Sequence, residues 1–388
     1  MSNTSSVDSE RIARLEQLVL NLQAEIDTIS KHNASHSINT SHSATPAPPT
    51  PPPPTTSPPE SIEDIRLFHH FCVSTSKTLA TEPSRHKLWS EFVPQLACTH
   101  PFLMRGLLAV SALHLSHLHP HQHAHYTHLS THHQTLSLTL FTAALPPTTT
   151  TLTPTTSPAF LLLSSLVFLL NTYPLAHPHN NTPITLPSIT QSLSLLRGTI
   201  SLLLLSPDVW QHARSGPLKD LFAHIEPVAH PRGPFVDKLD ALVDALRREL
   251  VGTPAKAKKR VALLAAVEAL RHTYALLVAA RVGDRRDRLW TWAVVIPEEV
   301  LALLEEECAV ALVVLAYFCV LVGSVECGVD WGEEQWFMKG WSGGVVECVV
   351  EVLERKEEEE GMWREWVEWP VSCVRKGLNV LETAGDST

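Results

Sequence analysis

Apolar side chains recur at helical spacing along most of the chain beyond residue 60. Stretches such as "SITQSLSLLRGTISLLLL" and "KKRVALLAAVEALRHTYALLVAARV" place an apolar side chain at about every third or fourth position, which is the period of an α-helix. Paired β-branched runs separated by hairpin turns do not occur in the sequence. The pattern predicts an all-α domain over residues 61–375, followed by a C-terminal tail at 376–388.

Residues 8–30 follow a second pattern, the heptad repeat of a coiled coil. The apolar positions alternate between spacings of three and four residues and are occupied by Ile12, Leu15, Val19, Leu22, Ile26 and Ile29. β-Branched residues at one heptad position and mainly leucine at the other favour a parallel two-stranded coiled coil. We therefore predict a homodimer joined through this dimerisation helix. Packing of the same amphipathic helix on its own domain is the alternative.

Residues 31–60 contain the stretch "TPAPPTPPPPTTSPPE" and few apolar side chains. A segment rich in proline, threonine and serine cannot bury enough apolar area to offset the entropy lost on ordering. Proline-rich segments instead stay extended and act as spacers. We predict a disordered linker between the coiled coil and the helical domain.

The two longest apolar runs are Ala309–Val322 and Pro158–Leu170. Both are shorter than the ~20 apolar residues that a helix needs to cross a bilayer. The polar N-terminal stretch lacks the apolar core of a secretory signal. The sequence therefore predicts buried helices and no membrane span.

The formal net charge of −10 disfavours a nucleic-acid-binding surface over the whole chain. Charge is unevenly distributed: residues 232–288 hold 13 Lys/Arg and 7 Asp/Glu, whereas residues 297–369 hold 4 and 18. The acidic stretch from Glu298 to Glu368 is expected to form a solvated surface. Contact of this surface with co-activators or import machinery is the alternative.

Seven cysteines without a CxxC pair are typical of reduced thiols in an intracellular protein. Motifs of phosphate-binding and metalloprotease sites, such as GxxxxGKS and HExxH, do not occur in the sequence. We therefore predict that the chain is not an enzyme and assign no catalytic residue.

A histidine tract ends the stretch from Phe92 to His133. Four of its members recur at steps of four, three and four residues and form one helical stripe: His121, His125, His128 and His132. The inward face of the same helix is marked by Tyr126, Leu129, Leu136 and Leu140. Two histidines one turn apart can chelate a metal, but residues 103–152 hold no Asp, Glu or Cys to complete a site. The pattern predicts a solvated histidine face and no metal ligand, with a metal site as the alternative.

Tryptophans concentrate near the C-terminus, where "VDWGEEQWFMKGWSGG" and "GMWREWVEWP" hold six of the ten. Tryptophan combines a large apolar surface with an N–H donor, and the neighbouring glycines permit turns. A pocket for a flat apolar ligand would have the preceding apolar helix as its floor and the aromatic turn as its wall. The candidate ligand-binding residues are Leu315, Tyr317, Phe318, Leu321, Trp336, Phe337, Met338, Gly340 and Trp341. A packed aromatic subcore is the alternative for the same residues.

Three blocks of the sequence resemble fungal transcription factors of the six-cysteine zinc-cluster family, in particular the sterol uptake control branch. Two of them are "IRLFHHFCVSTSKTLA" and "LWSEFVPQLACTHPFLMRGLLAVSALHLSHL". The third runs from "VVIPEEVLALLEEECAVALVVLAYFCVLV" through "WFMKGW" to "WVEWP". The resemblance covers about residues 61–371 and is one of character only between 145 and 290. It implies an all-α regulatory domain of the fungal-specific transcription factor type.

The resemblance also implies a nuclear regulator of RNA polymerase II transcription, moving from cytoplasm to nucleus on activation. Its C-terminal domain would sense a sterol or another apolar ligand. A dimerising helical adaptor that sequesters related regulators without sensing a ligand is the alternative. The family's zinc cluster has no counterpart here, since the first cysteine is Cys72. Zinc and DNA binding are therefore expected only from a module upstream, and no cofactor is expected in this chain beyond a sterol ligand.

Overall fold

The computed structural model describes residues 62–80, 82–144, 156–178, 183–204, 211, 215–222, 227, 231–250, 252–328, 336–356 and 363–382. Every regular element in these ranges is helical, and none of them is a strand. The prediction of an all-α fold is confirmed. The predicted coiled coil at 8–30 and the linker at 31–60 lie outside the described residues.

The described chain divides into two compact units. The first takes its residues from 1–80, 84–167 and 201–219, and the second from 81–83, 168–200 and 220–388. Helices α8 (Ser157–Ala176) and α9 (Leu186–Leu204) each contribute to both units, as does the short η5 (Lys219–Phe222). The sequence pattern predicts one domain because helical periodicity does not reveal which helices share a core.

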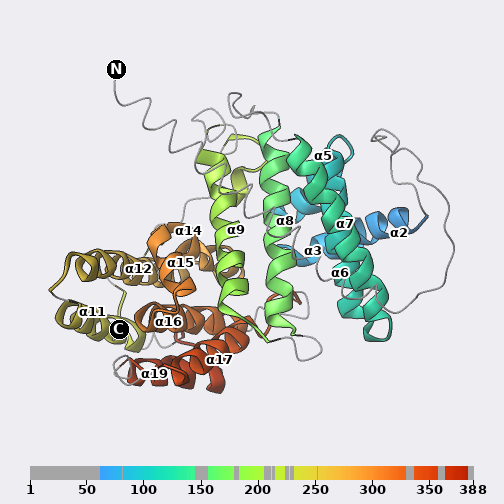
Figure 1. Ribbon diagram of the computed structural model, residues 1–388. Coiled ribbons are helices and arrows are strands. Elements are labelled where there is room, and N and C mark those ends of the chain that lie inside the picture. Colours follow the sequence, from blue (N-terminus) through green and yellow to red (C-terminus); the bar gives the residue numbers. More distant parts are fainter. Residues whose placement is uncertain are drawn as a thin grey trace. The chain divides into compact units, whose positions relative to one another are not determined.

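The first unit is built on the hairpin of α6 (Pro101–Leu118) and α7 (His123–Ala144), seen in Figure 1. Pro101 begins α6, where its missing N–H costs no helical hydrogen bond, and the turn η4 (Pro120–Gln122) precedes α7. Gly106 permits close packing on α8, since a Cβ there would lie 2.5 Å from Leu163 Cδ1. The preceding segments are α2 (Ile62–His70), η2 (Phe71–Thr75), α3 (Ser76–Thr78), α4 (Pro83–Lys87), η3 (Leu88–Phe92) and α5 (Val93–Ala97).

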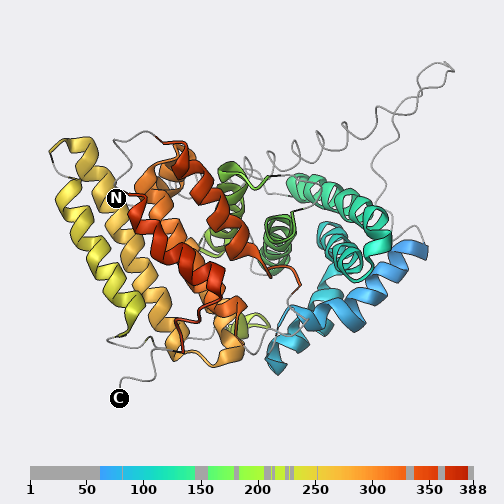
Figure 2. The ribbon, with the colours of Figure 1, turned by 90° about the horizontal axis from the view of Figure 1, so that it is seen from below.

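Helix α16 (Ala309–Glu326) forms the centre of the second unit. Every residue from Ala309 to Val325 is buried, which explains why this sequence is apolar on all sides. Helix α16 packs against α12, α17 and α19, as Figure 2 shows for the last two. The helices of this unit beyond η5 are α11 (Pro234–Glu249), α12 (Pro254–Ala279), η6 (Val282–Asp284), α13 (Arg285–Leu289), α14 (Thr291–Val295), α15 (Glu298–Glu305), α16, α17 (Trp341–Glu354) and α19 (Glu365–Lys376).

The chain after α19 packs back onto the second unit. Val380 and Leu381 are buried, and the Val380 N–H donates a hydrogen bond to Ser324 Oγ at 3.1 Å. Part of the segment predicted as a tail therefore belongs to the folded unit.

Three helices among the described residues are long and apolar enough to cross a membrane by length and composition alone: α8, α12 and α16. Helices α8 and α16 extend beyond the two apolar runs into less apolar residues and reach 20 and 18 residues. Within the fold, 94% of the apolar window of α16 and 83% of that of α8 are buried. Packing inside the chain thus accounts for their apolar character.

Candidate functional site

The nine predicted ligand-binding residues all lie in the second unit, and all except Gly340 are buried. Leu315, Tyr317, Phe318 and Leu321 come from α16, as the sequence predicts. The other five form the turn at 336–340 and the first residue of α17, which is Trp341.

Phe318 and Trp341 meet in one aromatic cluster with two tryptophans that the sequence prediction missed. Trp292 stacks on Phe318 with ring centroids 4.3 Å apart, and Trp290 lies 5.8 Å from Phe318 and 5.5 Å from Trp341. The rings of Phe318 and Trp341 are 6.0 Å apart, edge to face. These are favourable arrangements of aromatic rings. We call Trp290, Trp292, Phe318 and Trp341 the Trp341 cluster. The local sequence "LWTW" around Trp290 and Trp292 does not indicate that these two residues pack against Phe318.

Tyr317 joins a different cluster, because neighbouring residues of a helix point about 100° apart. Its ring lies 5.7 Å from that of Trp369 and 6.3 Å from that of Phe235. Burial holds the pKa of the Tyr317 phenol well above its ordinary value. The predicted floor is therefore divided: Phe318 belongs to the Trp341 cluster and Tyr317 does not.

The end of α8 holds the aromatic turn in place. His177 Nε2 donates a hydrogen bond to the carbonyl oxygen of Trp336 at 2.5 Å, and the Tyr173 ring lies 5.3 Å from the Trp336 ring. Burial lowers the pKa of His177, and the bond to Trp336 opposes that change. On α13, the Arg286 guanidinium lies 5.9 Å from the centre of the Phe337 ring, which is a cation–π contact.

Gly340 makes the entry into α17 possible. Its φ of 101° lies in the left-handed region, and a Cβ there would lie 3.0 Å from the carbonyl oxygen of Ala176. At the end of α16, the Glu326 carboxylate accepts hydrogen bonds from the Ser342 N–H, at 3.2 Å, and from the Ser342 hydroxyl. Burial raises the pKa of Glu326, and the Ser342 bonds oppose this. Trp341 is thus fixed by contacts from the ends of both α8 and α16.

The buried indole N–H of Trp341 has no hydrogen-bond acceptor among the described residues. Trp292, also fully buried in the same cluster, donates its indole N–H to the Ala266 carbonyl at 3.0 Å. An unpaired buried donor costs roughly 1–3 kcal/mol. An oxygen atom of an apolar ligand that reached Trp341 would therefore gain a hydrogen bond that the protein itself does not supply.

A surface groove of about 440 Å³ lies between α11 and α12, away from the Trp341 cluster. Its lining is mainly charged and includes Asp240, Asp244, Arg247, Glu268 and Arg271. Asp240 and Arg271 form an ion pair at 2.5 Å. This charged lining does not suit an apolar ligand, and none of the nine predicted residues contributes to it.

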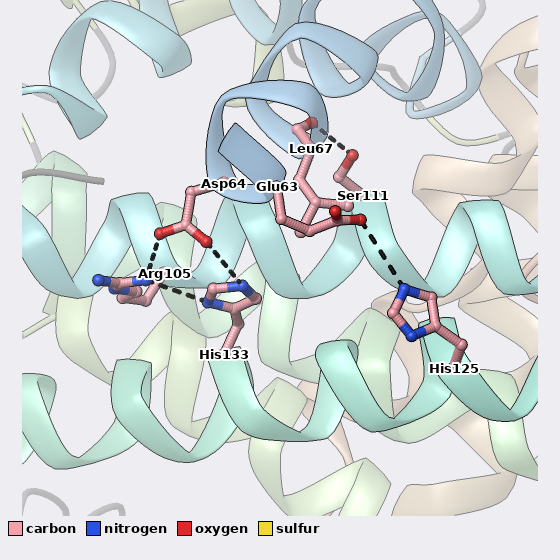
Figure 3. Close-up of polar contacts among 7 residues, drawn as sticks. All are labelled: Glu63, Asp64, Leu67, Arg105, Ser111, His125 and His133. Carbon is pink, nitrogen blue, oxygen red and sulfur yellow. Dashed lines mark hydrogen bonds and ion pairs between the residues drawn. The ribbon is translucent and has the colours of Figure 1, made fainter. Parts of the chain in front are cut away.

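In the first unit, a buried ionic network attaches α2 to the α6–α7 hairpin. Figure 3 shows Asp64 between Arg105 of α6 and His133 of α7. Asp64 Oδ2 lies 2.9 Å from Arg105 Nη1, and Asp64 Oδ1 lies 3.5 Å from His133 Nε2. Burial lowers the pKa of His133 to about 4, with Asp64 acting against this and Arg105 adding to it. Leu67 on the same helix packs against Leu108 of α6.

A second buried polar contact joins His114 of α6 to Thr75 of η2, which is a single π-helical turn. His114 Nδ1 lies 3.0 Å from Thr75 Oγ1 and 3.2 Å from His70 Nε2. Burial is the main cause that lowers the pKa of His114 to about 3, and His70 adds to it. The imidazole is therefore neutral in the fold at neutral pH.

The predicted solvated histidine face is confirmed, since His121, His125, His128 and His132 are all exposed. Among the described residues, no group of three His, Cys, Asp or Glu side chains is arranged to hold a metal. Carboxylates do approach the helix, although none is near in sequence: Glu63 lies 3.8 Å from His125. The predicted inward face is correct only in part: Leu129 packs against the core, whereas Leu140 is exposed. The side chains that α7 buries are Ser130, His133, Gln134, Ser137, Leu138 and Phe141.

The fold and this geometry define an all-α protein with an aromatic core and an unpaired donor. Residues 66–185 match the family described as fungal specific transcription factor domain. The matched segment includes α6–α8 and is less than half of the chain, and the match ends before the C-terminal block of the resemblance. The description of this family names transcription factors and is in keeping with the prediction that the chain is not an enzyme.

Two curated proteins are similar to parts of the chain. Sterol uptake control protein 2 of Saccharomyces cerevisiae is 46% identical over 54 residues, which are 14% of this chain and 6% of that protein. A Zn(2)-C6 fungal-type transcription factor of Gibberella zeae is 36% identical over 90 residues, which are 22% of this chain and 18% of that protein. The chain thus matches only a small part of the length of either relative.

Proposed function

We propose that the chain is part of a fungal transcription regulator that controls RNA polymerase II genes. The match of residues 66–185 to the fungal specific transcription factor domain is the observation that carries this proposal. The similarity to a sterol uptake control protein and to a Zn(2)-C6 transcription factor supports it. Dimerisation through residues 8–30 and work in the nucleus, after movement from the cytoplasm on activation, belong to the same proposal.

The second unit, on this proposal, senses a sterol or another apolar ligand at the Trp341 cluster. The unpaired indole N–H of Trp341 supports this, because it is a buried donor ready for a hydroxyl or carbonyl oxygen. A rigid ligand loses little conformational entropy on binding. Each Å² of apolar surface that it buries would contribute about 25 cal/mol.

The ligand would act by shifting a population between two packings. Phe318, Trp292 and Trp341 are fully buried, so a ligand can enter only where the packing around them opens. In this proposal the aromatic turn and the start of α17 move. Gly340 abuts the end of α8 at Ala176, which lies within the matched segment 66–185. A ligand that prefers the displaced turn would therefore alter α8 and the surface that co-activators meet.

A dimerising helical adaptor that sequesters related regulators is the second candidate. The packing of the Trp341 cluster favours this candidate, because Trp292, Phe318 and Trp341 are already fully buried by the protein's own side chains. Neither candidate assigns DNA or zinc binding to a residue of this chain, because its cysteines form no CxxC pair. Those activities would come from a zinc-cluster module.

A reporter assay separates the two candidates. The full chain is joined to an independent DNA-binding module, and reporter output is measured in sterol-replete and sterol-depleted yeast cells. A sensor changes the output with sterol supply. Trp341→Phe weakens this response, while Trp363→Phe, at a buried tryptophan outside the Trp341 cluster, preserves it. A chain that gives no output under either condition, yet represses a co-expressed relative in both, is an adaptor.

A further inference from the structure

Four cations crowd into "PAKAKKRV", the first two turns of α12. They are Lys256, Lys258, Lys259 and Arg260, and the first turn of the helix holds no acidic residue. The N-terminal end of a helix carries partial positive charge, and cations placed there are unfavourable. Like charges three or four residues apart also repel one another. The segment therefore keeps a charge pattern that opposes the start of its own helix.

The same two turns contribute nothing to the core. None of the residues described as buried lies between Pro254 and Val261, and the first buried side chain of α12 is Ala262. The contacts of the segment are peripheral. The Lys256 N–H donates to Thr253 Oγ1 at 3.2 Å and the Ala257 N–H to the Thr253 carbonyl at 2.9 Å. Lys258 Nζ lies 3.8 Å from Glu299 Oε1, and Arg260 Nη1 donates to the Leu250 carbonyl at 3.2 Å. Exposed ion pairs contribute little to stability. The segment can therefore unwind without opening the second unit.

Unwinding of the first two turns of α12 would place several of these cations on the same side of an extended chain. In an extended chain alternate side chains point to the same side, at a repeat of about 7 Å. Lys256, Lys258 and Arg260 would then form one row, separated by small or oppositely directed residues. In the helix the same side chains point in several directions. A partner with regularly spaced acidic pockets would recognise the extended form.

We propose that Pro254–Val261, the basic segment, is a motif that an acidic groove of a nuclear import receptor binds in extended form. Runs of five to eight residues rich in lysine and arginine serve as import signals. The proposal rests on the proposed nuclear function of the chain. Import is favoured over nucleic-acid binding because the segment has no aromatic ring for base stacking, Glu299 lies against Lys258, and the chain is acidic overall.

Binding is measured with the full chain, fluorescently labelled, and a purified armadillo-repeat import receptor. The triple variant Lys256→Gln, Lys258→Gln and Lys259→Gln should bind at least tenfold more weakly. The control variant removes the same charge at exposed positions of the first unit, through Arg66→Gln, Lys77→Gln and Lys87→Gln, and should bind like the wild type. Lysine-to-arginine replacement at the three basic-segment positions should restore binding.

Three results would overturn the proposal. The wild type does not bind the receptor, or the two glutamine variants lose receptor affinity equally. In the third, the wild type binds a DNA duplex, and the basic-segment variant alone loses this DNA binding while it still binds the receptor. Localisation of the tagged chain in cells separates this proposal from the proposed function. A wild-type chain that stays outside the nucleus under all conditions contradicts the regulator itself. If the wild type and the basic-segment variant are both nuclear to the same extent, only the proposed import motif is contradicted.

Discussion

Replacing Gly340 with alanine should destabilise the second unit more than the same change at any open glycine. The left-handed φ of 101° costs about 1–2 kcal/mol once a Cβ is present. The new Cβ would also lie 3.0 Å from the Ala176 carbonyl oxygen, and relieving such crowding costs about 1–3 kcal/mol. Together the two effects should lower the free energy of unfolding by about 2–5 kcal/mol.

Two other glycines separate these effects. Gly252 has a φ of 115°, but nothing lies within 4 Å of the position that a Cβ would take, so Gly252→Ala should cost only the backbone part, about 1–2 kcal/mol. Gly343 lies inside α17 with equally open surroundings and no left-handed φ. Gly343→Ala should therefore raise the free energy of unfolding by about 0.5–1 kcal/mol, since alanine favours helix.

Urea unfolding followed by tryptophan fluorescence suits this comparison, because only Trp89 and Trp210 of the ten tryptophans lie in the first unit. The signal therefore reports mainly on the second unit. Equal losses in Gly340→Ala and Gly252→Ala would refute the close approach of the turn to α8. A loss in Gly343→Ala similar to that in Gly340→Ala would refute the helical geometry at the start of α17.

Three further predictions concern the first unit and the N-terminus. Burial lowers the pKa of His114 to about 3, below its value in the unfolded chain, so the unfolded chain binds more protons in acid. The free energy of unfolding should be highest above pH 6.5 and should fall towards pH 4, with this histidine contributing a loss of up to roughly 3 kcal/mol. Thermal unfolding measured as a function of pH tests this. Leu15→Lys with Leu22→Lys places four charges in the predicted dimer seam and should leave monomers in sedimentation; an unchanged mass would exclude the coiled coil. His125→Gln with His128→Gln should leave helicity and Tm nearly unchanged, whereas one metal per chain that this variant loses would establish a metal site.

Helix positions could be predicted from the sequence because each helix carries its own periodic signal. The stretch that became α16 is apolar at nearly every position, and the structure buries it on all sides. The division into two units could not be predicted, since it passes through the interior of α8 and depends on which helices share a core. The extension of helices beyond their apolar runs was likewise hidden, because the ends of α16 include polar and acidic residues such as Glu326.

The candidate site was predictable only in part. Phe318 and Trp341 were expected together and do meet, because both belong to strongly apolar stretches that are close in sequence. Trp290 and Trp292 were missed because nothing in their local pattern points to Phe318. Tyr317 was assigned to the same floor because apolar character alone does not define a helix face.

Polar pairs between residues far apart in the chain could not be predicted either, because the local sequence pattern does not show which helices pack together. Asp64 binds Arg105 and His133, which lie 41 and 69 residues further along the chain. The sequence around the histidine tract holds no acid, although Asp64 lies beside His133 in the fold. Only the docking of α2 on the α6–α7 hairpin brings them together, and there Leu67 packs with Leu108 and Ala112.

Equilibrium binding of a radiolabelled sterol to the full chain tests ligand sensing most directly. We predict saturable binding at one sterol per chain. Trp341→Phe should weaken it about fivefold, the equivalent of one hydrogen bond worth about 1 kcal/mol. Trp363→Phe should leave the affinity unchanged, because Trp363 is a buried tryptophan of the same unit that lies outside the Trp341 cluster. Absence of saturable binding, or equal affinities for the two variants, would contradict a sensor at Trp341.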